Sequence, residues 1–160
     1  MLKIKPFKQK PSSCGPASLK MVLGYYGVTK SEKELGRLSG CTKAHGTKTK
    51  GLLKAAKHSG FTGFIKDFSD IKDIRHYVTK KKIQVIVNLF SVSEGLSRGV
   101  AGIDKEKIYL EDPEFGRMRS MLLNDFKAVW FDFSSPWLKS KSDLVIRRMP
   151  VVVPKTKKLG

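Results

Sequence analysis

The stretch from Gln9 to Gly27 constrains the fold more than any other part of the chain. Its apolar residues recur at the spacing of one helix face, with a glycine after them to end the helix: Leu19, Val22, Leu23, Tyr26 and Gly27. Ser12 and Ser13 are residue types that cap helices, and Pro16 fits a first helical turn, where no amide hydrogen is needed. The sequence therefore predicts a buried helix that begins at Cys14.

Cys14 lies at the start of this helix, five residues after Gln9. Unpaired amides and the helix dipole at that end favour an anion, so we expect them to stabilise a thiolate and lower the pKa of the thiol. The side-chain amide of Gln9, on the incoming loop, is placed to stabilise an oxyanion. A lone cysteine at a helix start is also common as a small apolar residue, so these residues alone leave both interpretations open.

The segment resembles the active-site segment of the bacteriocin-processing peptidases, papain-like cysteine peptidases that cut double-glycine leader peptides. Their pattern is a glutamine, a short gap, and Cys-Gly-Pro-Ala-type residues opening a helix that ends near Tyr-Tyr-Gly. The matching residues here are Gln9, Cys14, Gly15, Pro16, Ala17, Tyr25, Tyr26 and Gly27. The resemblance implies Cys14 as nucleophile, Gln9 in the oxyanion hole, a peptide or protein substrate, and no cofactor.

Helical patterns come first along the chain and strand patterns later. Helices are predicted over 14–26, 31–38, 47–59, 70–80 and 124–129, and strands over 61–68, 83–90, 100–103, 107–111, 119–121 and 144–153. This order predicts an α+β fold of the papain-like cysteine peptidase type, with N-terminal helices packed on a C-terminal antiparallel β-sheet. We expect residues 1–160 to form a single peptidase-like domain, with a frayed tail from about residue 154.

A peptidase of this kind also needs an imidazole and a group that orients it. The resemblance places the orienter in an Asp-Pro pair, present here as Asp112-Pro113, and the imidazole sixteen residues earlier, at position 96. That position is Leu96, and the Gly-Ile-Asp turn from Gly102 supports the same alignment. Losing one member of a triad costs roughly 10³ to 10⁶ in rate. Without its histidine, Asp112 can also be an ordinary turn former.

The other histidines and cysteine give no clear substitute. His45 lies in a loop, His58 near a helix end, and His76 on the helix before the central strand, twenty residues before position 96. Surface or structural roles are favoured for all three, although a loop movement could bring His45 to the site. Cys41 is expected to be a loop or partly buried thiol, since two cysteines lack a disulfide framework and metal-ligand spacing.

The chain is strongly basic, with 32 Lys and Arg residues against 14 Asp and Glu residues and a net charge of +18. Such a charge attracts acidic surfaces, including a peptide with an acidic segment. Because the lysines are scattered and no nucleic-acid-binding motif accompanies them, a solvated surface is favoured and nucleic acid is not the expected partner. No stretch resembles a signal peptide or a transmembrane span, so we expect a cytoplasmic, reduced protein. With no nucleotide-binding loop, an export transporter would be a separate chain.

Two functional hypotheses follow. In the first, the chain is a cysteine peptidase that cleaves peptide bonds through Cys14 and is impaired by the missing histidine. In the second, it is a catalytically inactive peptidase-like domain that binds a peptide or leader sequence without cutting it. Cys14 and Gln9 favour the first hypothesis, because a pure binding domain needs neither, and Leu96 favours the second.

Overall fold

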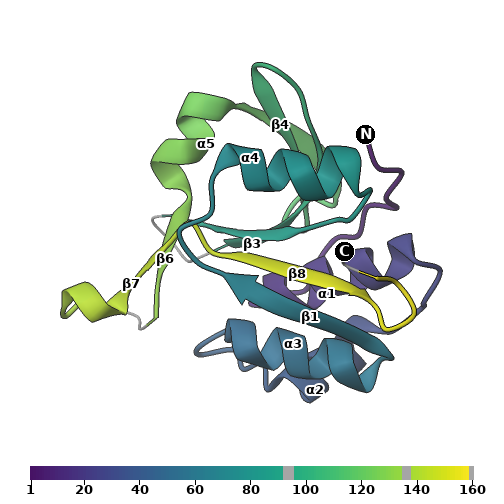
Figure 1. Cartoon of the computed structure of the whole chain (residues 1–160). Helices are drawn as coiled ribbons and strands as arrows, with labels where there is room; N and C mark the ends of the chain where they lie inside the picture. Colours follow the sequence, from purple (N-terminus) through teal and green to yellow (C-terminus); the bar gives the residue numbers. More distant parts are fainter. Residues whose placement is uncertain (92–95, 135–137, 159–160) are drawn as a thin grey trace.

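The structure is a computed structural model that describes residues 1–91, 96–134 and 138–158. Three N-terminal helices are packed together; in Figure 1 two of them lie below the strands and the first lies behind β8 and β1. They are α1 (Cys14–Tyr25), α2 (Glu32–Ser39) and α3 (Thr49–His58). The predicted helix at Cys14 is therefore confirmed, and its residues from Gly15 to Leu23 are buried apart from Lys20.

The helix starts differ in how they are capped. Ser31 accepts a hydrogen bond from the amide of Glu34 and so caps α2, and Gly40 ends that helix in the left-handed conformation. The prediction that serines cap α1 is wrong. Ser13 has a φ of −112° and a ψ of 23°, outside the extended region of an N-cap, and makes no capping hydrogen bond.

The strands form one twisted antiparallel arrangement in the order β1-β8, then β2-β3-β4-β5, with a bridge between Val85 and Val151 joining the two groups. The strands are β1 (Phe61–Lys66), β2 (Ile86–Leu89), β3 (Leu96–Ile103), β4 (Lys107–Asp112), β5 (Arg117–Leu122) and β8 (Met149–Pro154). The papain-like α+β fold is confirmed in outline. One addition is that β1, from the N-terminal half of the chain, pairs with the last strand.

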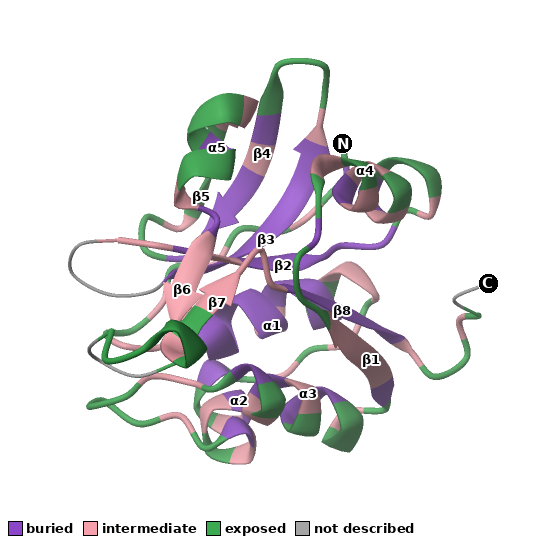
Figure 2. Ribbon diagram, turned by 60° about the vertical axis from the view of Figure 1, so that its left-hand side comes forward, coloured by how far each residue is buried: buried purple, intermediate pink, exposed green. Residues whose placement is uncertain are grey.

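Apolar residues on the two faces of the sheet build two cores. Ile86 and Val152 pack with α1, α2 and α3. Their neighbours on the same strands, Val87 and Val151, pack on the opposite face. That opposite face is covered by α4 (Ile71–Ile74), the π-helical segment η1 (Arg75–Lys80) and α5 (Leu123–Val129). Strands β2, β3 and β8 are therefore largely buried on both faces and are mostly purple in Figure 2, whereas the edge strand β5 is mostly exposed. None of the described helices is long and apolar enough to cross a membrane.

The chain between α5 and β8 differs from the prediction of one strand over 144–153. It forms a separate hairpin of β6 (Phe131–Phe133) and β7 (Leu144–Ile146), which projects to the left in Figure 1. The strand breaks at Arg147, whose φ is 47°, before β8 begins. Beyond Pro154, where a frayed tail was expected, the Lys155 amide donates to Gly60 O at 3.2 Å and the Lys157 amide to Pro154 O at 2.9 Å.

A close contact between α2 and α3 generates a stability prediction. A Cβ added at Gly51 of α3 would overlap the carbonyl oxygen of Ser39, which is backbone and cannot move aside. Gly51→Ala is therefore expected to lower the free energy of unfolding by about 2–4 kcal/mol.

Gly24→Ala on α1 is the matched control. A Cβ at Gly24 meets nothing within 4 Å, so the same substitution should be neutral or stabilise the helix by up to about 1 kcal/mol. Urea unfolding of both variants measures the difference, and equal effects would show that the α2–α3 contact is looser than described.

Candidate functional site

The start of α1 is held against the start of β3. Ser18 Oγ donates to the carbonyl oxygen of Ser97 at 2.8 Å, and both residues are buried. Cys14 lies four residues before Ser18, on the same helix face. The fold thus brings the helix end that carries Cys14 to the strand end that carries Leu96.

The loop before Cys14 is fixed by residues from three other parts of the chain. The amide of Gln9 donates to the carbonyl oxygen of Pro113 at 2.7 Å, which places Gln9 beside the Asp112-Pro113 pair. The amide of Lys10 donates to Glu32 Oε1 at 2.8 Å. Cys41 Sγ donates to the carbonyl oxygen of Ser12 at 3.4 Å, in a turn where Ser12 has a φ of 60°. Cys41 thus helps to hold the turn that precedes Cys14, a role that its sequence context did not indicate.

Two buried polar atoms near Cys14 have no hydrogen-bond partner among the described residues, Gln9 Oε1 and Thr47 Oγ1. Thr47 packs onto the backbone of Gly15, where an added Cβ would lie 3.0 Å from Thr47 Cβ. A side chain at position 15 would therefore push the Thr47 and Leu52 side chains aside by a few tenths of an ångström. Buried polar atoms are usually satisfied, so these two mark a place where a bound group could donate or accept a hydrogen bond.

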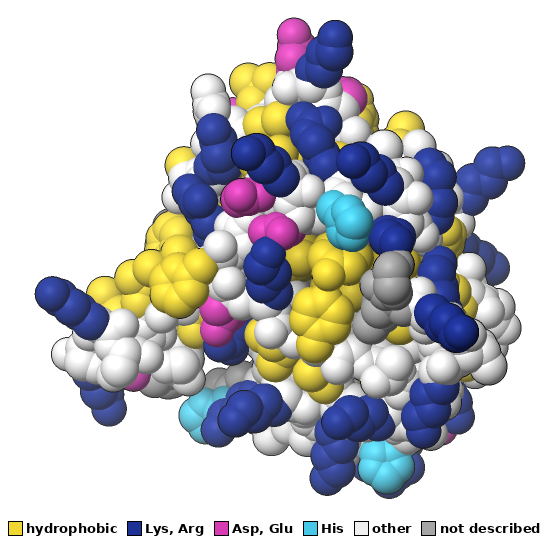
Figure 3. Space-filling view, viewed as in Figure 1, with side chains coloured by type: hydrophobic (Ala, Val, Ile, Leu, Met, Phe, Trp, Pro, Cys, Tyr) yellow, Lys and Arg dark blue, Asp and Glu magenta, His cyan; other side chains and the backbone are white. Residues whose placement is uncertain are grey.

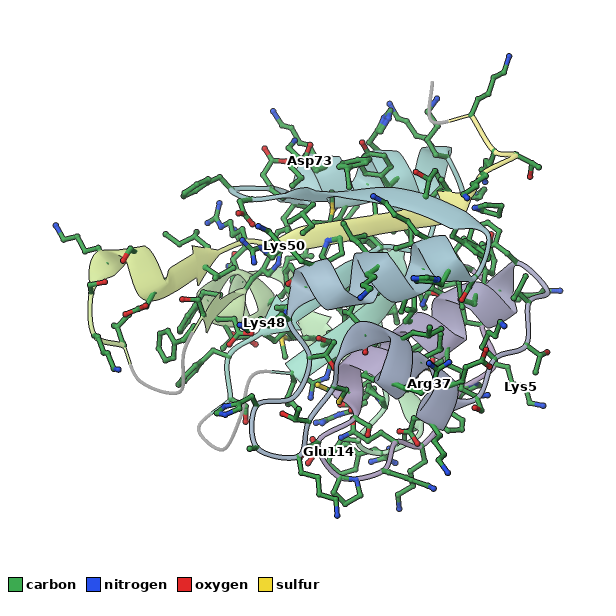
Figure 4. All side chains as sticks on the ribbon, turned by 90° about the horizontal axis from the view of Figure 1, so that it is seen from below. Lys5, Arg37, Lys48, Lys50, Asp73 and Glu114 are labelled. Atoms are coloured by element: carbon green, nitrogen blue, oxygen red, sulfur yellow. The ribbon has the colours of Figure 1, made fainter. Side chains whose placement is uncertain are left out.

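Asp112, the predicted orienter, has both of its carboxylate oxygens engaged. Oδ2 accepts from Arg98 Nε at 3.0 Å and from Arg119 Nη1 at 3.3 Å, while Oδ1 accepts from the amide of Glu114 at 3.0 Å. The Asp112 residue is 2% exposed and Arg98 is buried beside it. A guanidinium, not an imidazole, is thus the main partner of this carboxylate. Glu114 is labelled in Figure 4.

Leu96 is the first residue of β3, pairs with Leu89 of β2, and is 7% exposed. It lies two residues before Arg98 and so on the same face of the strand. The histidines lie elsewhere: His45 is exposed in the loop before α3, His58 is exposed at the end of α3, and His76 is exposed on η1. The described residues contain no group of three or more His, Cys, Asp or Glu side chains that could hold a metal ion.

The residues that the sequence analysis missed are those that hold the site from outside the motif. Glu32, Cys41 and Thr47 follow Cys14 by 18 to 33 residues, and no sequence pattern links them to it. Arg98 lay outside the strand predicted over 100–103, so its place on the same strand face as Leu96 became clear only from the longer β3 of the structure.

The family model that describes the peptidase C39 family matches residues 5–134. The chain belongs to the peptidase C39 family. An uncharacterised protein of Methanothermobacter marburgensis is 35% identical over 109 residues, which cover 67% of this chain and 69% of that protein. The match to the family model ends at residue 134, so strands β7 and β8 lie outside that match.

Solved structures share the fold of this C39 domain at low sequence identity. The peptidase domain of Streptococcus ComA, a bifunctional ABC transporter, superposes with a TM-score of 0.71 at 22% identity and covers 97% of this chain and 100% of that one. A double-glycine-motif protease from an AMS/PCAT transporter, in complex with its leader peptide, gives 0.68 at 19% identity, with 96% and 93% covered. A C39-like peptidase from Bacillus anthracis gives 0.68 at 16%, with 96% of each chain covered.

Breaking the Arg98–Asp112 pair should destabilise this C39 domain. Arg98→Met leaves a buried carboxylate with only the half-exposed Arg119 guanidinium and one amide as partners, and is expected to cost about 2–4 kcal/mol. Arg119→Met is the control, because that side chain is 51% exposed and its pair with Asp112 should contribute at most about 1 kcal/mol. Denaturant unfolding measures both, and a larger loss for Arg119→Met would contradict the assignment of Arg98 as the main partner.

Glu111, next to Asp112, generates a pH prediction. Burial raises the pKa of Glu111, and its Oε2 has no hydrogen-bond partner among the described residues. Between the ordinary and the raised pKa the folded protein binds more protons than the unfolded chain, so stability due to Glu111 falls as pH rises.

Glu111→Gln should therefore unfold at a higher temperature than the wild type at pH 8, and the gain should shrink or reverse near pH 4. Thermal unfolding across this range measures it. A gain that is the same at both pH values would show that ionisation of Glu111 does not lower stability.

Proposed function

We propose that this C39 domain binds a peptide at the Cys14 site and does not hydrolyse it. The observation that carries the proposal is the occupation of Asp112 by Arg98, Arg119 and the Glu114 amide. In a triad the carboxylate must accept from an imidazole that in turn faces the thiol. Here the carboxylate is engaged with guanidinium groups, and leucine stands at position 96, to which the resemblance assigns the imidazole.

Peptide binding is supported by the groups that remain near Cys14. Gln9 Oε1 can accept a backbone N–H, and Thr47 Oγ1 can donate or accept. The structure of the AMS/PCAT transporter protease holds a leader peptide, and we propose a peptide of that kind as the ligand here. The domain would hold such a peptide in the cytoplasm for a separate export transporter.

A second candidate function is slow hydrolysis by Cys14. It is favoured by the place of Cys14 at a helix start, with Gln9 hydrogen-bonded beside Asp112-Pro113. In that case a base from another part of the chain must take the thiol proton, and His45, in the loop before α3, is the first to test.

The deciding experiment compares binding and cleavage of one fluorescent double-glycine leader peptide. Wild type and Cys14→Ala are expected to bind it equally, by fluorescence anisotropy, and to leave it uncut to the same extent. Wild type that cleaves measurably faster than Cys14→Ala would overturn the proposal in favour of the second candidate. Failure of both proteins to bind would remove peptide binding at this site.

Introducing a histidine at position 96 and removing Arg98 from Asp112 gives a further prediction. Leu96→His alone should gain little activity, because Arg98 still occupies Asp112. Leu96→His with Arg98→Val removes the main partner of Asp112, leaving only the half-exposed Arg119 and the Glu114 amide, and should gain about 10² or more in cleavage rate over wild type. The control is the same pair of changes with Cys14→Ala, which must stay inactive.

Alkylation of Cys14 by iodoacetamide, followed by mass spectrometry to separate it from Cys41, tests the thiol directly. We expect the double variant to react faster than wild type at low pH, because its histidine can pair with the thiolate. A wild-type thiol that already reacts rapidly well below pH 8 would support the slow-hydrolysis candidate.

A further inference from the structure

Strand β5 is an unpaired edge of the sheet. It is last in the order β2-β3-β4-β5, and five of its six residues, Arg117 to Leu122, are exposed. Met118 is 42% exposed and Leu122 is 50% exposed. The strand contains no proline, and its register with β4 is unbroken from Arg117 to Leu122. These are the properties of an edge that can accept another strand.

The pairing with β4 fixes which backbone groups point outward. The amide of Leu123 donates to the carbonyl oxygen of Glu106, so this pair and every second pair along the ladder exchange hydrogen bonds. Arg117, Arg119 and Met121 therefore direct their amides toward β4. The amides of Met118, Ser120 and Leu122 and the carbonyls of Met118 and Ser120 point away from the sheet, and among the described residues no backbone hydrogen bond reaches them from a loop or turn. Leu122 is the N-cap of α5, so its carbonyl faces the first turn of that helix.

The two faces of the strand differ in chemistry. Arg117 and Arg119 lie on one face, with the ring of Phe115 5.8 Å and 4.9 Å from their guanidinium carbons, and Phe115 is 49% exposed. Met118 and Leu122 lie on the other face. Arg119 contacts Asp112, whereas Arg117 takes part in no ion pair among the described residues. One face is thus basic and aromatic, and the other is apolar.

The charge on this edge selects among strands that could pair with it. A second copy of β5 would add its own arginines to the same edge, and like charges on adjoining strands destabilise a sheet. An acidic strand complements it. The rest of the surface is basic as well, with Lys and Arg spread over the view in Figure 3 and over separate elements in Figure 4, from Lys5 to Lys50. The scattered lysines attract an acidic partner from any direction. Hydrogen bonds to the open backbone of β5 can then fix how the partner strand is aligned with β5.

We propose that β5 binds an extended segment of a partner protein by strand addition, and that this segment carries acidic residues at alternate positions. Its acidic side chains lie on the face of Arg117 and Arg119, and its intervening apolar side chains lie on the face of Met118 and Leu122. Its backbone pairs with the outward amides of Met118, Ser120 and Leu122 and with the outward carbonyls of Met118 and Ser120. The inference goes beyond the proposed function, because this edge is separate from Cys14 and can bind whether or not that site does.

Hydrogen exchange, followed at each amide by NMR, tests the pairing with a synthetic peptide of about seven alternating Glu and Val residues. The peptide should slow exchange at Met118, Ser120 and Leu122 at least about tenfold and leave Arg119 and Met121, already bonded to β4, unchanged. The same peptide with Gln in place of Glu should bind at least about tenfold more weakly at low salt. Binding without protection of the outward amides would overturn the proposal.

Proline at position 120 gives an independent test. Ser120→Pro removes an outward amide that the fold does not use, so an edge strand tolerates it, and affinity for the acidic peptide should fall about tenfold or more. Ser120→Ala keeps the amide and should bind within about twofold of wild type. Equal affinity of the two variants would exclude strand pairing.

The remaining variants cover the other outcomes. If Ser120→Pro is unfolded by circular dichroism, Arg117→Glu takes its place and should abolish preference for the acidic peptide over the Gln peptide. A single-stranded DNA oligonucleotide that displaces the peptide and leaves the outward amides unprotected would show diffuse attraction of polyanions, which overturns the proposal. The double-glycine leader peptide should not displace the acidic peptide, and this separates the edge from the Cys14 site. Displacement would place the acidic peptide at the Cys14 site and overturn the proposal.

Discussion

The packing of α1 against the sheet is the contact on which the rest of the structure depends. The helix lies between α2, α3 and the strands, and its apolar residues share a core with Ile86 and Val152. The hydrogen bond from Ser18 to Ser97 fixes the position of the helix along β3. Because Cys14 is one turn away, this contact also sets where the thiol lies relative to β3 and to Asp112 on the neighbouring strand.

The Arg98–Asp112 pair links the fold to the chemistry of the site. A buried carboxylate needs partners, since an isolated charge in the interior is strongly unfavourable. In a triad peptidase the imidazole supplies part of that compensation. In this C39 domain Arg98 and Arg119 supply it, so Asp112 is stabilised without any histidine. The same ion pair that stabilises Asp112 thus occupies the carboxylate oxygen that an imidazole would need.

The net charge of +18 acts over longer distances than these contacts. It is spread over many elements and does not define a site (Figure 3). What distinguishes one part of the surface is backbone geometry, since β5 combines two arginines with unpaired amides and carbonyls. Long-range attraction and short-range pairing are therefore separate contributions, the first nonspecific and the second dependent on register.

The sequence by itself determined the helix at Cys14, the turn at Asp104, the α+β order and the family, because each depends on local patterns or on a contiguous motif. The resemblance also assigned the imidazole to position 96, where the residue is Leu96, and this assignment stays a prediction. The sequence placed Ser12 and Ser13 as caps wrongly, and it merged β7 with β8, because the positive φ of Arg147 is imposed by the fold.

Only the tertiary structure decided that Arg98 takes the carboxylate of Asp112, that Cys41 and Thr47 adjoin the Cys14 turn, and that β5 is left as an open edge. These features join residues far apart in the chain. They follow from the register of antiparallel strands and from helix-on-sheet packing, which local sequence preferences do not encode.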